Sequence, residues 1–131
     1  MRLAILLTTL LALGFAAPPR AGDDTKAAAV QSFMRKVHGK GGLAGRVYLL
    51  FRERSYKDAA ELMRQWQAGA DALAAKVPIK GDFASFRKRA EGYRVAVQSL
   101  RESISQENPK AVQAALAKVG ATCKSCHAAH R

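Results

Sequence analysis

Seven apolar positions between residues 83 and 104 recur at alternating intervals of three and four residues. They are Phe83, Phe86, Ala90, Tyr93, Val97, Leu100 and Ile104. This spacing places all seven on one face of an α-helix, and Asp82 directly before them is a good N-cap. A helix with one continuous apolar seam must bury that seam against other helices or a sheet. No stretch of useful length alternates with period two, so the partners are expected to be helices.

Three further segments have helical patterns: about residues 24–52, 55–77 and 109–130. The third of these opens with Asn108 as N-cap and Pro109 in the first turn. The segment before it starts at Ser55, with Asp58 in a capping-box-like position, and is expected to end at Pro78. Four helices with short connections predict an all-α fold, an antiparallel four-helix bundle.

The first helical segment combines an apolar stripe of helical spacing with glycines that disfavour a helix. Its apolar stripe is Val30, Met34, Val37, Gly41, Ala44, Tyr48 and Phe51. Four glycines within residues 39–45 weaken the helix, since each costs up to about 1 kcal/mol relative to Ala. Either the helix breaks there or another group closely approaches its backbone.

The N-terminus has the layout of a secretory signal peptide. Met1 and Arg2 are followed by an apolar run over residues 3–13 and by small residues, and we expect cleavage after Ala16. The run of about 11 residues is shorter than the roughly 20 that a membrane-spanning helix needs, so no stable membrane anchor is expected. We therefore expect residues 1–21 to be signal peptide and short linker, residues 22–131 to be the folded domain, and the protein to be exported to the periplasm.

The chain is basic: 22 Lys and Arg residues against 10 Asp and Glu residues give a formal net charge of +12. The charges are scattered over the expected helices, as on a solvated surface. Such a balance also suits an acidic partner protein met by electrostatic steering. Export argues against nucleic acid as the partner.

The only two cysteines form the sequence Cys123-Lys124-Ser125-Cys126-His127, a C-x-x-C-H attachment site for c-type haem. On a helix these positions share one face, so both thiols can add to the vinyl groups of one porphyrin while His127 binds the iron as proximal ligand. A thiol–disulfide redox site is an alternative, but such sites usually lie in α/β folds. A zinc site would need a fourth ligand, His130 or His38, and adjacent ligands would strain its geometry.

The position of this sequence at the C-terminal end of an expected four-helix bundle resembles the class II c-type cytochromes, the cytochrome c′ family. The resemblance rests on C-x-x-C-H followed by three residues and a basic residue, and on the approach Val119-Gly120-Ala121-Thr122. The resemblance is expected to extend from Asp24 to Arg131, although only the last dozen residues are specific. It implies one haem c, covalently attached on the C-terminal helix, with Arg131 near the proximal imidazole.

The resemblance leaves the sixth iron ligand open between a methionine and no protein ligand. Met34 matches the position from which methionine-ligated relatives bind the iron, although a methionine on an apolar stripe also serves as core packing. Lys80 stands after Pro78-Ile79, where many five-coordinate members have a tryptophan, which favours the low-spin branch. His38, four residues after Met34, is a less favoured ligand.

The other candidate positions are expected to pack or to face solvent and not to bind iron. His130 is expected to face solvent, Met63 to be core, and Phe33 with Val37 to line the distal side of the haem. Trp66 and Tyr93 are expected to be core aromatics, with stacking near the haem as the alternative.

These features predict a single-electron carrier with His127 and Met34 as iron ligands. The alternative is a five-coordinate haem protein that binds nitric oxide or carbon monoxide. A thiol–disulfide protein without haem is less favoured. No nucleophile–base pair, carboxylate dyad or phosphate loop is present, so substrate turnover is not expected. The family resemblance also implies a homodimer formed through the first two helices.

Overall fold

The computed structural model describes residues 21–76 and 78–130. Within them the chain is helical and contains no strand. The elements are α1 (Ala21–His38), α2 (Leu43–Arg52), α3 (Tyr56–Leu73), α4 (Phe83–Ser105) and α5 (Pro109–His130). Of the expected signal peptide and linker over residues 1–21, residues 1–20 lie outside the described residues, as does Arg131, and Ala21 is the first residue of α1. No helix in the described ranges is long and apolar enough to cross a membrane.

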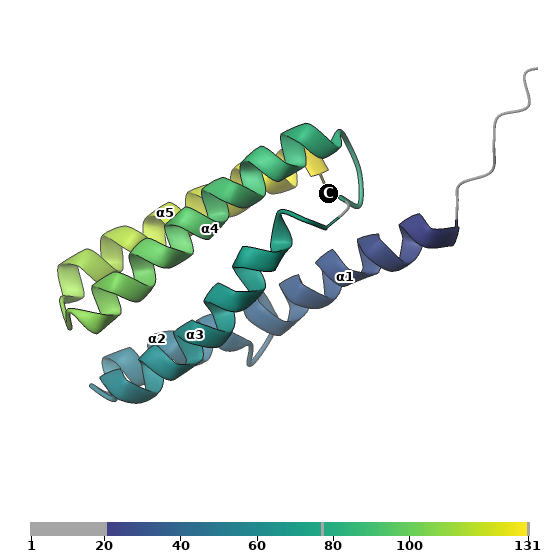
Figure 1. The fold of residues 1–131 in the computed structure, drawn as a ribbon. Coiled ribbons are helices and arrows are strands. Elements are labelled where there is room, and N and C mark those ends of the chain that lie inside the picture. The colour runs from purple at the N-terminus through teal and green to yellow at the C-terminus, as the bar shows by residue number, and fades with distance from the viewer. Residues whose placement is uncertain (1–20, 77, 131) are drawn as a thin grey trace, which may run out of the picture.

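The helices form four arms, in agreement with the expected bundle. Figure 1 shows α4 and α5 side by side along their length, with α2 and α3 as a second pair. α3 also packs against α4, and α1 packs mainly against α2 and α3. The first arm is therefore α1 followed by α2.

The first arm is broken at the glycines, which is one of the two alternatives that the sequence left open for residues 24–52. α1 ends at His38 and α2 begins at Leu43. Gly41 has a φ of +72°, in the region that favours glycine. A Cβ at Gly42 would lie 2.5 Å from the carbonyl oxygen of Val37, so the turn closes on a backbone that only glycine allows.

The break also changes which residues of the first arm face the core. Val30 and Val37 are buried as expected, but Tyr48 is 47% exposed. Leu43 and Val47, each one residue before an expected stripe position, are buried instead. The turn over residues 39–42 shifts the helical phase by one residue, which periodicity alone does not reveal.

α3 follows its predicted stripe and begins after Ser55 as expected, but its cap and its C-terminal end differ from the prediction. The Ser55 side chain makes no capping hydrogen bond, and the helix ends at Leu73, before Pro78. Its buried stripe is Ala59, Leu62, Met63, Trp66, Ala70 and Leu73, which confirms Met63 and Trp66 as core residues.

The caps of α4 and α5 are as predicted. The backbone N–H of Ser85 donates to Oδ2 of Asp82 at 2.7 Å, and that of Ala111 donates to Oδ1 of Asn108 at 3.1 Å. Six of the seven seam positions of α4 are buried, whereas Phe83, in the first turn, is 45% exposed.

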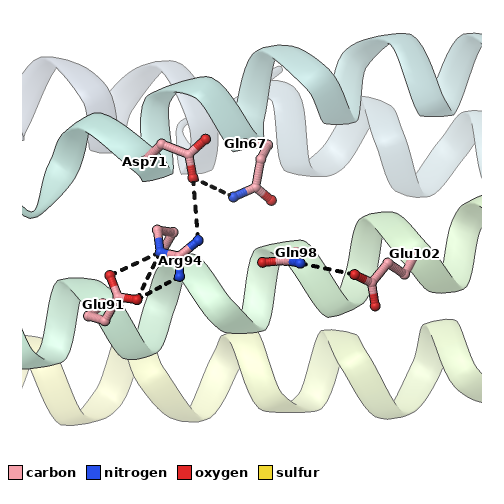
Figure 2. A network of polar contacts seen from close by, with 6 residues as sticks. All are labelled: Gln67, Asp71, Glu91, Arg94, Gln98 and Glu102. Atoms are coloured by element: carbon pink, nitrogen blue, oxygen red, sulfur yellow. Dashed lines mark hydrogen bonds and ion pairs between the residues drawn. The ribbon is translucent and has the colours of Figure 1, made fainter.

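Polar side chains bridge α3 and α4 on the outer surface of the bundle (Figure 2). Arg94 is paired with Glu91 on its own helix and approaches Asp71 of α3 at 4.0 Å. Gln67 donates its Nε2–H to Asp71 at 2.8 Å, but its Oε1 atom is buried without a hydrogen-bond partner. Exposed ion pairs of this kind stabilise little, so α3 and α4 are held mainly by the apolar seam beneath them.

Candidate functional site

The cysteines and the following histidine lie in the last two turns of α5. Cys123 and Cys126 are partly buried free thiols packed against the core cluster, and His127 is exposed. The helix carries the thiols toward the core because its buried positions Val112, Ala115 and Val119 continue in the same phase.

Two adjoining cavities open beside these residues. The smaller, about 230 Å³, is named the inner cavity, and the larger, about 440 Å³, the outer cavity. Both are lined by Met34 and His38 of α1 and by Cys126 and His127 of α5. Together they are within the range of small-molecule and cofactor pockets, about 300–1,000 Å³.

The remaining walls of the cavities are largely apolar. Leu73, Ala90, Thr122 and Cys123 line the inner cavity, and Val30, Ile79 and Phe86 line the outer one. Two thiols, an imidazole and an apolar enclosure between two helices fit a covalently attached haem. They fit because the thiols and the imidazole face the space that a porphyrin would fill.

The acidity of the two thiols does not favour disulfide chemistry. Burial, followed by the neighbouring Cys126, raises the pKa of the Cys123 thiol, and burial also raises the pKa of Cys126. Reactive cysteines of C-x-x-C redox proteins instead have lowered pKa values, because the thiolate is the nucleophile. The arrangement suits thiols that are consumed once in thioether formation.

Met34 is half-buried on α1, and it shares both cavities with His127. The structure thus brings together the two residues that the sequence analysis proposed as iron ligands. Their side chains come from α1 and α5, so a group bound between the two helices can contact both.

His38, one turn after Met34, belongs to a cluster with two core aromatic residues. Its Nε2 atom lies 2.9 Å from the Tyr93 hydroxyl, and Trp66 donates its indole N–H to the same hydroxyl at 2.6 Å. The His38 ring meets the rings of Trp66 and Tyr93 edge-on, at centroid distances of 5.5 and 5.9 Å. Tyr93 is a core residue, as expected, and it also lines the inner cavity.

Burial sets the protonation states in this cluster. Although the His38 side chain is exposed, partial desolvation, followed by the charge of His127, lowers its pKa. Burial raises the pKa of Tyr93, so its hydroxyl stays protonated and able to donate. Both shifts favour the neutral forms, an imidazole beside a phenol.

His130 is buried, so its expected exposure is wrong. The residue is 5% exposed, its Nδ1–H donates to the carbonyl oxygen of Lys80 at 2.9 Å, and its Nε2 lies 3.2 Å from the Ser85 hydroxyl. Its ring also meets Phe86 edge-on. The last turn of α5 is thus fastened to the loop that precedes α4.

Phe33 and Val37 do not line these cavities, contrary to the expectation for a distal pocket. They line a separate pocket between α1 and α3, where the Phe33 ring packs directly on Gly69. Met34 and His38, which directly follow Phe33 and Val37 along α1, line the cavities instead.

The wall residues that sequence reasoning missed include Leu73, Ile79, Ala90 and Thr122. Ala90 had a detectable signal, because it is the one small residue on the α4 seam and leaves space opposite the cysteines. The other three depend on how the helices pack, which no local pattern encodes.

A metal held by protein side chains alone has no support in the described residues. No group of three or more His, Cys, Asp or Glu side chains there is placed to hold a metal ion. His130, one proposed fourth zinc ligand, has both ring nitrogens within hydrogen-bond distance of Lys80 and Ser85.

Comparison with known proteins gives one match. The family model described as Cytochrome C′ matches residues 51–131, a range that includes α3, α4, α5 and the C-x-x-C-H sequence. No curated protein and no solved structure matches the chain. Because the family match covers more than half of the sequence and includes the cavity-lining end of α5, the chain belongs to the cytochrome c′ family of c-type haem proteins.

Proposed function

We propose that the protein is a periplasmic single-electron carrier whose haem c is attached to Cys123 and Cys126, with His127 and Met34 as the iron ligands. One observation carries this proposal: Met34 of α1 lines the same two cavities as His127 of α5. When bound, haem supplies a one-electron redox couple, and methionine ligation raises its reduction potential.

The chain's own residues account for the rest of the carrier function. The thiols of Cys123 and Cys126 tether the cofactor, so a temporary loss of one ligand does not release it. The apolar side chains of Leu73, Ala90 and Phe86 keep water away from the cavity walls. This favours a small reorganisation energy for electron transfer. No substrate turnover is proposed.

The electron partner is proposed to be an acidic protein. A groove of about 620 Å³ between α4 and α5 is lined by Lys88 and Arg89 and by no acidic residue. Arg89 contacts Ser125, which lies between the two cysteines, so a partner bound there would be one helix away from the haem. The rate of electron exchange should fall steeply with ionic strength, because a partner of opposite charge is steered by this surface.

A homodimer formed through the first helices is also proposed. Tyr48 and Leu49 of α2 are 47% and 54% exposed, an apolar pair that a second subunit would cover. Sedimentation of the wild-type protein and of a Leu49→Glu variant tests this assembly, since the charge should yield a monomer.

A second candidate function is binding of nitric oxide or carbon monoxide at a five-coordinate iron. The apolar wall that Val30, Ile79 and Phe86 give the outer cavity favours it, because a small apolar gas would be accommodated there.

The absorption spectrum of the reduced, haem-loaded protein separates the two functions. The carrier should give a sharp low-spin spectrum that carbon monoxide does not change, and Met34→Ala should convert it to a gas-binding, high-spin form. A wild-type spectrum that is already high-spin and shifts with the gas would refute methionine ligation. Cell fractionation tests the proposed export, with the folded protein expected in the periplasmic fraction.

A further inference from the structure

α1 presents two side chains of a kind that binds haem iron. Met34 and His38 are four residues apart, hence on the same face of the helix, and both line the inner and outer cavities together with His127. If His127 is the proximal ligand, as in the proposed function, the two residues compete for the sixth position.

An imidazole competes strongly with a thioether for the sixth position of the iron. Neutral imidazole suits iron, and partial burial lowers the pKa of His38, which favours its neutral form. A methionine-ligated haem in this chain therefore requires something that restrains His38.

The hydrogen bonds around Tyr93 supply that restraint. Trp66 Nε1–H can only donate, so the Tyr93 oxygen accepts this bond at 2.6 Å. The phenol then has one proton to donate, and Nε2 of His38 lies 2.9 Å away. With the His38 proton on Nδ1, Tyr93 donates to Nε2 and occupies the lone pair that would bind iron.

The restraint is anchored in the rigid part of the bundle. Trp66 is 1% exposed and Tyr93 is 4% exposed, and Phe33 packs edge-on against Tyr93 at a centroid distance of 6.2 Å. We name His38, Tyr93 and Trp66 the aromatic clasp. Because Trp66 lies on α3 and Tyr93 on α4, two helices hold a side chain of a third.

We propose that Tyr93, positioned by Trp66, holds His38 away from the haem iron and so leaves the sixth position to Met34. This inference rests on the proposed function for the place of the haem. It assigns Tyr93 a positioning role, since the residue acts on the iron only through His38.

The decisive variant is Tyr93→Phe, which keeps the ring and removes the hydroxyl. Haem-loaded wild type and variant are compared by the methionine-to-iron charge-transfer band of the oxidised protein and by near-infrared magnetic circular dichroism. The variant should lose the methionine band, gain a bis-histidine signature and show a lower reduction potential. Tyr56→Phe is the matched control, because Tyr56 packs against Phe51 at the start of α3 and lies outside the clasp; it should keep the wild-type spectrum.

Two further variants connect the change to His38. The double variant Tyr93→Phe with His38→Gln should regain the methionine band, because the competing imidazole is gone. Trp66→Phe keeps the phenol but removes its donor, and it should give a mixture of methionine and histidine ligation. Should Tyr93→Phe not fold, this variant carries the test, and a pure methionine spectrum in it would overturn the inference.

Failure of the inference is distinct from failure of the proposed function. A methionine band in wild type that persists unchanged in Tyr93→Phe overturns the aromatic clasp and leaves the electron-carrier proposal intact. A wild type without that band refutes Met34 ligation. If the wild type lacks the band, a bis-histidine signature that appears in Tyr93→Phe but not in Tyr56→Phe still supports the restraint of His38 by Tyr93. The absence of that signature from Tyr93→Phe overturns the inference.

Discussion

The Nδ1 atom of His130 lies 2.9 Å from the carbonyl oxygen of Lys80, so the last turn of α5 is tied to the loop that precedes α4. The same ring lines the outer cavity beside His127. The end of the chain that carries the haem-attachment sequence is therefore held on the bundle by a buried hydrogen-bonded side chain.

Replacing His130 with Ala should lower the free energy of unfolding of the haem-loaded protein by about 1–3 kcal/mol. The change leaves the Lys80 carbonyl without its donor and removes the packing of the ring on Phe86. Urea unfolding followed by circular dichroism measures the loss. Gln113→Ala, on the exposed face of α5, is the control and should change stability by less than about 0.5 kcal/mol. Equal effects of the two substitutions would contradict the role given to His130.

Two glycine-to-alanine substitutions should act in opposite directions. Gly81 has a φ of +87°, and a Cβ there would lie 2.8 Å from Nδ1 of His130, so Gly81→Ala should destabilise the fold by more than about 1 kcal/mol. Gly92 is exposed within α4 with open space around it, so Gly92→Ala should stabilise by up to about 1 kcal/mol through helix propensity. Thermal unfolding of both variants checks the pair, and a shift of the same sign in both would be inconsistent with this geometry.

Gln67 is a buried polar residue whose removal should not harm the fold. Its Oε1 atom has no hydrogen-bond partner, while its amide reaches the exposed Asp71 (Figure 2). Gln67→Met keeps the length of the side chain and removes the unpaired acceptor, so the free energy of unfolding should rise by up to about 1 kcal/mol. Gln98→Met, at an exposed position of α4, serves as the control. A loss of more than about 1 kcal/mol in Gln67→Met would show that the amide is satisfied in solution.

Acidification should destabilise the haem-free chain through His38. The pKa of His38 in the folded chain is below its ordinary value of 6.5, so the unfolded state takes up the proton first as the pH falls. The stabilisation from neutral His38 is complete above the unfolded pKa and is lost as the pH falls below it. Urea unfolding at about pH 7.5 and about pH 5.5 should show this loss. His38→Gln should have a smaller difference between the two pH values; an unchanged difference would assign the effect to other groups.

The sequence was most informative where local chemistry decides the structure. The α4 seam and the Asp82 and Asn108 caps were predictable, because spacing and capping act within one or two helical turns. The C-x-x-C-H sequence was also readable, since its chemistry depends on the spacing of three neighbouring residues.

Features that depend on packing between helices were not predictable. The turn over residues 39–42 shifts the phase of the first arm, so Leu43 and Val47 replaced the expected stripe positions in the core. His130 looks like a solvent-facing terminal residue until Lys80 and Ser85, more than 40 positions away, come into contact with it. The bond between His38 and Tyr93 likewise joins residues 55 positions apart.

The central claim is that this chain carries one haem bound covalently at Cys123 and Cys126. Intact-mass measurement under denaturing conditions tests it most directly, on protein expressed together with the haem-attachment machinery. We predict a mass increase of one haem that survives denaturation, and its complete absence in a variant with both cysteines changed to Ala. A wild-type mass equal to that of the polypeptide alone would contradict the claim.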